Sequence, residues 1–384
     1  MRLLPLFLVS SLLHAWIGWR ISSELLNWPA GTILLWGMLC LSALLMPMAL
    51  LARRASRMSL LLAWGGALAM GLFSTLLVLS VLRDALLFLA WGISVLLAPE
   101  SAWFDGLRHW SALAVLAAGL LASAWGLWNA RRTARVVRVD VPIVGLPAAL
   151  HGFTVAQISD IHVGSTIRQG YIERIVERVN ALGVDMVAIT GDLVDGSVAD
   201  LQRHVAPVAG LKSRHGSFFV TGNHEYYSGA NAWITELRRL GVTVLMNEHV
   251  VLRHDSDLQP DGANLVVAGV ADFSAHHFDE DHRSDPVAAL LGAPAAGIRL
   301  LLAHQPRSAQ VASDAGFDLQ LSGHTHGGQF WPWMHFVKFQ QPFTAGLHRL
   351  EKLWVYTHRG TGYWGPPKRF GAPSEITQLR LVTA

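Results

Sequence analysis

The chain has 384 residues, of which 52% are hydrophobic and only 15% charged, and its mean hydropathy is +0.36. Since about 25% of residues are charged in an average soluble domain, we expect a membrane section beside one large soluble domain. The net charge of +3 is too small to indicate a nucleic-acid partner, and the single cysteine, Cys40, excludes an intramolecular disulfide and a thiolate metal site.

The apolar excess lies before about residue 130. We expect membrane-spanning helices at 3–21, 32–52, 59–82 and 110–128, because each segment is long enough to cross a hydrocarbon core of about 30 Å. A fifth segment, 85–97, is short and bounded by charges, so it is predicted to be a short span, a re-entrant segment or an interfacial helix. The first segment is expected to remain uncleaved, since further spans follow. Spans without charges near their middle favour an anchor over a transporter.

Two basic stretches predict how the chain is oriented. They lie at 53–57 and 131–138, and four spans place both on one side of the membrane, whereas five would separate them. Positive residues favour the cytoplasmic side. We therefore expect an integral protein of the cell (inner) membrane with its soluble domain in the cytoplasm. The expected organisation is a transmembrane region at 1–130, a basic linker with a first strand at 131–150, and the soluble domain at 151–384.

In the soluble half, short β-rich runs alternate with helical stretches, which predicts an α/β architecture. Helices are expected at 170–182 and 230–240. The strands are expected at 153–159, 186–190, 217–220, 298–303 and 317–321. A residue able to bind a metal follows each of these strands, and ligands of α/β sheets bind beyond the carboxyl ends of strands. Gly191, Gly222 and Gly323 stand where the chain must leave a strand sharply, which glycine allows.

The residues at these strand ends predict a metal site. The candidate ligands are Asp160, His162, Asp192, Asn223, His304, His324 and His326. Imidazole and carboxylate ligands together suit Mn, Fe or Zn. Seven ligands are too many for one ion and suit two divalent ions that share a bridge, for which Asp192 is the natural candidate. A hydroxide held between the ions is the predicted nucleophile, and His224 is the predicted general acid.

Five blocks of sequence in this order resemble the calcineurin-like metallophosphoesterases. They are Ser-Asp-Ile-His at 159–162, Gly-Asp-Leu-Val-Asp at 191–195, Gly-Asn-His-Glu at 222–225, Ala-His-Gln-Pro at 303–306 and Gly-His-Thr-His-Gly-Gly-Gln at 323–329. The resemblance runs from about residue 154 to the C-terminus and implies a four-layer αββα sandwich. It also implies a catalytic role for His224. The implied first metal site consists of Asp160, His162, Asp192 and His326, and the implied second site consists of Asp192, Asn223, His304 and His324.

With its multi-span N-terminus, the chain resembles the membrane-associated branch of that family. The resemblance implies a hydrolase of phosphomonoester, phosphodiester or pyrophosphate bonds, acting with metals such as manganese on an amphiphilic small molecule or lipid at the bilayer. Some relatives act on lipid-linked sugar nucleotides, so the leading substrate prediction is a pyrophosphate of the UDP-diacylglucosamine type, which would place the protein in lipid A biosynthesis. The alternatives are a protein or nucleotide phosphatase with the same site, and a non-enzymatic membrane scaffold or sensor that retains the metal-binding fold.

Four features outside the ligand set have predicted roles. Asp195 and Glu225 are expected to support or cap the ligand loops, not to bind metal. The histidine-rich segment 276–282 is expected to be a solvated loop. The aromatic segment 330–343 is either a packed surface loop or an apolar lid that meets the membrane or an acyl chain. The segment 358–360 either contacts phosphate or has a structural role.

Overall fold

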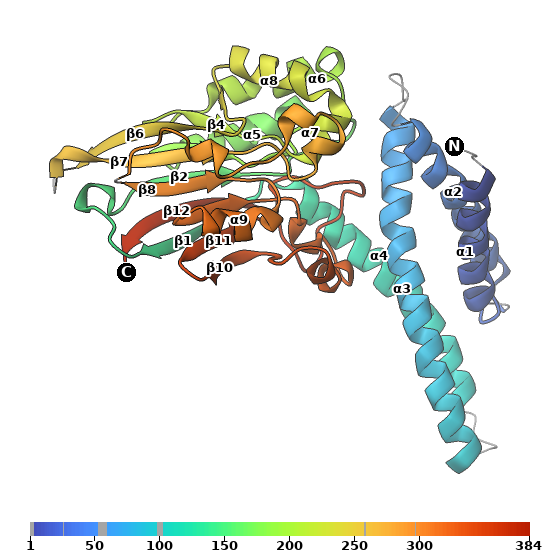
Figure 1. Cartoon of the computed structure of the whole chain (residues 1–384). Helices are drawn as coiled ribbons and strands as arrows, with labels where there is room; N and C mark the ends of the chain where they lie inside the picture. Colours follow the sequence, from blue (N-terminus) through green and yellow to red (C-terminus); the bar gives the residue numbers. More distant parts are fainter. Residues whose placement is uncertain (1–3, 26, 53–59, 98–102, 257–258, 296) are drawn as a thin grey trace. The chain divides into compact units, whose positions relative to one another are not determined.

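The computed structural model of the chain describes residues 4–25, 27–52, 60–97, 103–256, 259–295 and 297–384. Its contacts divide it into two compact units. One contains residues 1–128 and the short segment 365–368, and the other contains residues 129–364 and 369–384. The first unit is helical, and the second carries both β-sheets (Figure 1).

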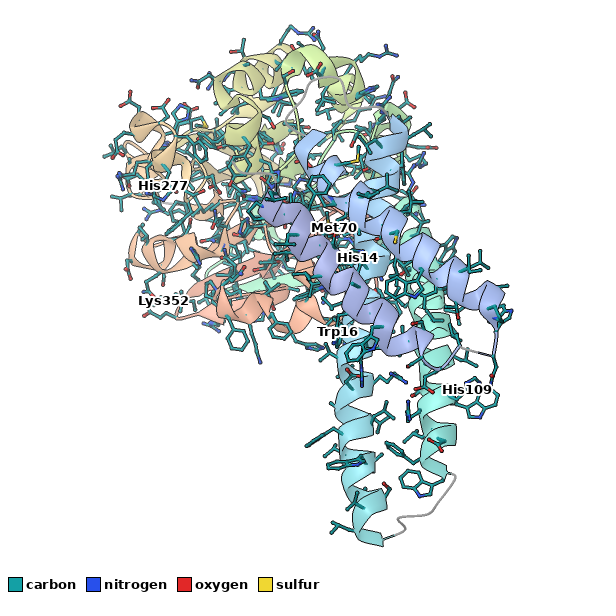
Figure 2. All side chains as sticks on the ribbon, turned by 90° about the vertical axis from the view of Figure 1, so that its right-hand side faces the viewer. His14, Trp16, Met70, His109, His277 and Lys352 are labelled. Atoms are coloured by element: carbon teal, nitrogen blue, oxygen red, sulfur yellow. The ribbon has the colours of Figure 1, made fainter. Side chains whose placement is uncertain are left out.

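The helical unit is formed by α1 (Leu4–Ser22), α2 (Pro29–Ala52), α3 (Leu60–Leu97) and α4 (Trp103–Arg131). Within the described residues, these four helices are long and apolar enough to cross a membrane. They pack through a shared apolar interior that includes Ile17, Leu39, Leu76 and Ala112. His14, labelled in Figure 2, is also buried and pairs its Nε2 with Ser42 Oγ at 2.8 Å. The four predicted apolar helices are confirmed, although the third is longer than predicted.

The predicted break between segments 59–82 and 85–97 is wrong. Both belong to α3, a single helix of 38 residues, which at 1.5 Å per residue is about 57 Å long and exceeds a hydrocarbon core of about 30 Å. Arg83 and Asp84 therefore lie inside a helix. Neither is a helix breaker, and the Asp84 carboxylate accepts hydrogen bonds from Arg20 Nε and Nη2 at 2.9 and 2.7 Å.

Charged groups at this level of α3 connect three helices. The guanidinium of Arg83 is buried and donates to Ser111 Oγ at 3.0 Å, to the carbonyl of Arg20 at 3.1 Å and to that of Arg108 at 2.9 Å. Glu24 in turn accepts from Arg108 Nη2 at 2.8 Å. The buried charge is thus paired and hydrogen-bonded, which is the condition under which such a group is tolerated.

The second unit contains two six-stranded sheets. The order of the first is β1 (Arg135–Ile143), β12 (Glu375–Thr383), β2 (Thr154–Ile158), β3 (Met186–Ile189), β4 (Ser217–Phe219) and β5 (Thr243–Val244). The order of the second is β10 (Gly346–Leu350), β11 (Leu353–Thr357), β9 (Leu319–Ser322), β8 (Ile298–Leu302), β7 (Gln259–Gly269) and β6 (Glu248–Ser256). A buried core that includes Val155 and Ala188 of the first sheet and Leu300 and Leu321 of the second fills the space between them.

Helices cover the outer face of each sheet. The first sheet is covered by α5 (Gln169–Asn180), α6 (Val198–Val205) and α8 (Ala230–Arg239), whose buried residues share one core with it. On α5 the apolar residues Tyr171, Ile175 and Val179 recur every four positions, so that one face is buried. Ala309 and Ala312 of α9 (Ala309–Asp314) pack against the second sheet. The layers are helix, sheet, sheet and helix, which confirms the predicted fold.

Candidate metal centre

The predicted ligands come from strands of both sheets. β2, β3 and β4 of the first sheet and β8 and β9 of the second each lead into a loop that carries one or two of them. Gln157 of β2 donates through Nε2 to the carbonyl of Ser322 of β9 at 3.0 Å, so the carboxyl ends of these two strands meet. The loops are also tied together, because Asp160 N donates to the carbonyl of Gly191 at 3.0 Å. The sandwich therefore gathers residues that lie up to 166 positions apart, from Asp160 to His326.

One group of ligand atoms consists of side chains from Asp160, His162 and His326, all within 4.8 Å of one another. The Nε2 atoms of the two histidines are 3.0 Å apart, and His326 Nε2 is 3.5 Å from Asp160 Oδ1. Asp192 Oδ2 lies 3.9 Å from His162 Nε2. These four residues are the set expected for the first metal.

A second group consists of Asp192, His304 and His324, again within 4.8 Å of one another. His304 Nε2 is 3.2 Å from Asp192 Oδ2 and 3.2 Å from His324 Nδ1. Asn223 Oδ1 lies 3.1 Å from the same nitrogen of His324. The structure thus brings all seven candidate ligands together, and Asp192 Oδ2 lies at the junction of the two groups.

The donor atoms fit divalent cations. Imidazole nitrogens and carboxylate oxygens converge with their coordinating atoms turned towards one another, and ligands of this type suit Mn, Fe or Zn. His304 also hydrogen-bonds through Nδ1 to the carbonyl of Thr190 at 2.7 Å, which orients its Nε2 towards the site. A second hydrogen bond of this kind is the usual support of a histidine ligand.

The backbone at the centre is strained. Five of the seven candidate ligands have positive φ angles between 51° and 70°; they are Asp160, His162, Asp192, His324 and His326. The left-handed region costs a residue with a side chain about 1–2 kcal/mol. Strain of this kind persists only where the surrounding structure over-determines it, and it clusters at functional sites.

Two of the three motif glycines have a different role from the one predicted. Gly191 has a φ of +86°, as expected for a sharp exit from a strand. Gly222, with a φ of −100°, and Gly323 do not need the left-handed region. A Cβ on Gly222 would lie 2.2 Å from Asp192 Oδ1, and one on Gly323 would lie 2.4 Å from Asp160 Oδ2. These two glycines therefore leave room for the carboxylates of the site.

A third group within 4.8 Å joins His224 to two of the candidate ligands, His162 and Asp192, and Asp195 holds the ring of His224. Its Nδ1 lies 2.6 Å from Asp195 Oδ1, which also accepts from His162 Nδ1 at 2.9 Å. Burial by itself lowers the pKa of His224, but the negative charge of Asp192 and the hydrogen bond to Asp195 outweigh it and raise the pKa to about 9. The ring is thus oriented through Nδ1, which leaves Nε2 free to face a substrate.

Glu225 ties two ligand loops to each other. It lies in the first turn of α7 (Asn223–Ser228) and is fully buried. Its carboxylate accepts from the backbone N–H groups of Gly222 at 2.6 Å, Asp192 at 3.0 Å and Leu193 at 2.8 Å. As expected, Glu225 caps backbone N–H groups of the two ligand loops. It contributes no atom to the clusters of metal-binding side chains found among the described residues.

Sequence reasoning missed two supporting residues. Arg369 is buried and donates to the carbonyl of His326 at 2.9 Å and to its Nδ1 at 3.1 Å. Nothing local in its sequence indicates this role, because its partner lies 43 positions away.

Asp272 is buried and accepts from Gln305 Nε2 at 3.1 Å. It follows β7, so the rule that ligands lie at strand ends could have drawn attention to it.

Three other predicted segments lie outside the ligand groups. The histidine-rich segment 276–282 forms two short 3₁₀ turns in a loop, and none of its residues joins the metal-type clusters found in the described chain. In the segment 358–360, Arg359 pairs with Glu375 at 3.1 Å and His358 Nδ1 accepts from Gly360 N at 2.9 Å, which favours the structural alternative. The aromatic segment 330–343 exposes Trp333, Phe336 and Phe339.

Comparison with known proteins places these observations in a family. Residues 153–328 match the model of the family described as "Calcineurin-like phosphoesterase". It is 37% identical over 294 residues to a transmembrane protein with metallophosphoesterase domain from Danio rerio, covering 75% of this chain and 66% of that relative. The corresponding protein of Bos taurus is 40% identical over 279 residues, with 71% and 62% covered. An uncharacterized metallophosphoesterase of Aquifex aeolicus is 30% identical over 249 residues, with 64% and 91% covered. The chain thus spans 66% and 62% of the length of the two animal relatives.

Proposed function

This chain belongs to the calcineurin-like phosphoesterase family, and from this membership we propose that it is a membrane-anchored hydrolase of phosphoester or pyrophosphate bonds that uses two divalent metal ions. One observation carries the proposal. Six of the seven predicted ligands form three overlapping groups of metal-binding side chains, two of which contain Asp192. One of these two groups includes His224, whose ring is oriented by Asp195.

The chemistry follows from what each residue can do. Divalent ions held by the two groups would supply Lewis-acid polarisation of a phosphoryl group and a nucleophile at neutral pH, since they lower the pKa of water to about 7. The shared carboxylate of Asp192 would keep the two sites close and offset part of their charge. His224, held at Nδ1 by Asp195, donates a proton from Nε2 to the leaving oxygen.

Two features support an amphiphilic substrate. The chain is a membrane protein with four helices of spanning length among its described residues. The segment that follows the last ligand exposes Trp333, Phe336 and Phe339, with Lys338 between them, and such residues favour the interface of a bilayer. We propose that the substrate is a membrane-associated or lipid-linked phosphoester or pyrophosphate, with the UDP-diacylglucosamine type as the leading candidate. The proposed location is the inner membrane, with the catalytic unit in the cytoplasm.

The proposal is tested by turnover. The full chain is purified in detergent, stripped with a chelator and assayed on an aryl phosphodiester with manganese, iron or zinc added back. Asp192→Asn and His224→Ala are expected to lower kcat at least about 100-fold, whereas Asp200→Asn, a change at an exposed carboxylate of α6, leaves it unchanged. Near-normal rates in both site variants would contradict the mechanism. Metal binding without turnover by the unaltered chain would support a scaffold or sensor instead.

A second assay addresses the substrate class. A UDP-diacylglucosamine-type pyrophosphate, a nucleoside monophosphate and a phosphopeptide are compared at equal concentrations with the metal that gives the highest rate. We expect the lipid-linked pyrophosphate to have the largest kcat/KM. A clear preference for the nucleotide or the phosphopeptide would replace the lipid proposal and leave the two-metal mechanism in place.

A further inference from the structure

A row of aromatic rings extends outward from His224. The ring of Tyr227 lies 5.2 Å from that of His224 at 74°, and the ring of Trp364 lies 5.8 Å from it at 78°. Phe278 continues the row, 5.4 Å from Tyr227 at 70°. His224 is therefore in contact with two large aromatic rings, both set nearly perpendicular to its own.

These rings are exposed, although their backbones are firmly held. Tyr227 is 63% exposed, Phe278 51% and Trp364 48%, whereas the side chain of His224 is only 16% exposed. Large exposed rings that adjoin one another form the type of patch that marks a binding site. Their exposure beside a buried centre indicates that they contact something other than the fold.

Trp364 is held by a residue of the last ligand motif. Gln329 donates through Nε2 to the carbonyl of Trp364 at 2.8 Å and accepts from its backbone N–H through Oε1 at 2.8 Å. This pair of bonds ties the position of Trp364 to the loop that carries His326. The sequence does not predict this link, because Gln329 stands in the last ligand motif and Trp364 lies 35 positions further along the chain.

Tyr227 and Phe278 are held from the other side of the site. Tyr227 lies in α7, the helix that contains His224 and that Glu225 caps. Phe278 follows the loop that begins at Asp272, whose carboxylate accepts from Ser274 N at 2.9 Å. The backbone on this side of the site is thus held by hydrogen bonds near both rings, while the rings themselves stay exposed, as expected of a preformed contact surface.

We infer that Tyr227, Trp364 and Phe278 form a binding surface for an apolar body attached to the leaving oxygen of the substrate, and that Tyr227 and Trp364 determine specificity. The inference rests on the proposed function, in which His224 protonates that oxygen. Whatever is bonded to the oxygen must then lie beside His224, where these rings are. The shared chemistry is an apolar group, which an acyl or alkyl chain and a flat aromatic group would both provide.

The test uses three phosphate monoesters whose phenol leaving groups have similar acidity. Phenyl phosphate is the reference, 2-naphthyl phosphate extends it with an aromatic ring, and 4-hexylphenyl phosphate extends it with an alkyl chain. The full chain in detergent, loaded with metal, is assayed by release of inorganic phosphate. We expect it to prefer the extended esters about tenfold in kcat/KM, mainly through KM, because the added apolar surface is removed from water.

The variants are chosen so that a structural effect can be recognised. Tyr227→Ala and Trp364→Ala are expected to reduce the preference for the extended esters to about twofold, and Trp364→Phe to retain most of it. A merely structural role would lower kcat equally for all three esters. Leu291→Ala removes an apolar side chain that is 77% exposed and lies outside the row, and it serves as the matched control.

Each outcome has a defined meaning. A preference for the naphthyl ester alone supports the inference and identifies an aromatic leaving group, whereas a preference for both extended esters supports it and identifies an acyl or alkyl group. Equal selectivity in the unaltered chain and in both alanine variants overturns the inference and leaves the proposed function intact. Failure of the unaltered chain to hydrolyse any of the three esters overturns this inference, and its rate on the aryl phosphodiester then decides separately whether the proposed function stands.

Discussion

At the scale of single residues, Asp195 has two tasks. One of its oxygens accepts from a candidate ligand, His162, at 2.9 Å and from the proposed acid, His224, at 2.6 Å. A carboxylate in this position orients both rings, because each imidazole donates from Nδ1 and keeps Nε2 towards the site. In His162 this leaves the Nε2 lone pair for a metal, whereas in His224 a second proton on Nε2 is the one proposed to be donated. The same group therefore couples metal binding to proton donation.

Asp195→Asn should separate these two tasks. The amide keeps the shape of the side chain but loses the charge, so we expect kcat on an aryl phosphodiester to fall about 100-fold with little change in KM. Metal content is measured in parallel, since a weakened His162 would lower it. Asp200→Asn, an exposed carboxylate on α6, is the control. A normal kcat with full metal occupancy would show that Asp195 does not orient the acid.

Glu225 is the second residue whose effect extends beyond its own contacts. Its carboxylate satisfies three buried backbone N–H groups within 3.0 Å, and a fourth, that of Val194, lies at 3.3 Å. Buried donors that lose their acceptor each cost about 1–3 kcal/mol.

We therefore expect Glu225→Ala to lower the melting temperature of the purified chain by about 10 °C or more, given that 1 kcal/mol corresponds to about 2–4 °C in a domain of this size. Thermal unfolding followed by circular dichroism gives the measurement. Glu177→Ala, at an exposed position of α5, should leave the melting temperature within about 1 °C. An unchanged transition in Glu225→Ala would mean that water or another group replaces the carboxylate.

At the scale of elements, α3 depends on Arg83. Its guanidinium is buried and binds carbonyls of Arg20 and Arg108 and the hydroxyl of Ser111, so one side chain connects α1, α3 and α4. Removing one partner from a buried ionic network costs about 3–5 kcal/mol, because it leaves other groups unpaired.

Arg83→Ala is accordingly expected to lower the yield and the melting temperature of the detergent-solubilised chain. Arg83→Lys should recover only part of the loss, since an ammonium group cannot reproduce the fork of donors. Arg178→Ala, which removes an exposed arginine of α5, should have no effect. Full recovery by lysine would indicate that the charge alone is required.

The elements also show why part of the fold could be predicted and part could not. β2, β3, β8 and β9 are short apolar runs followed by polar residues, and this local pattern was sufficient to locate them. The pattern does not say which strands pair, so the distribution of the ligands over two sheets was visible only through the family resemblance. The helix break expected at Arg83 and Asp84 is not present. These two charges are paired inside the helical unit by residues such as Arg20, which lies 64 positions from Asp84 and could not be identified as a partner from the local sequence. Arg369, Asp272 and Trp364 likewise act through residues distant along the chain.

At the scale of the whole molecule, the four helices determine which parts of the chain share a side of the membrane. Asp105 lies in the first turn of α4, and the soluble unit follows the end of this helix. The 29 residues of α4 make it about 44 Å long, which is more than the thickness of a hydrocarbon core of about 30 Å. The basic residues at 53–57, which lie outside the described residues, and those at 131–138 would face the cytoplasm under the positive-inside rule. With four crossings, the rule predicts that the soluble unit lies in the cytoplasm and that Asp105 lies on the opposite side.

This orientation can be tested with single cysteines, because Cys40 is the only one in the chain. In a Cys40→Ala background, Asp105→Cys and Glu177→Cys are each exposed to a membrane-impermeant maleimide in sealed vesicles of known orientation. Both side chains are exposed, so reactivity depends on the side of the membrane. We expect Glu177→Cys to react only from the cytoplasmic face and Asp105→Cys only from the other. Reaction of both from one face would contradict the crossing of α4, and the reverse pattern would show that the basic stretches do not set the orientation, so that substrates would have to reach the site from outside the cell.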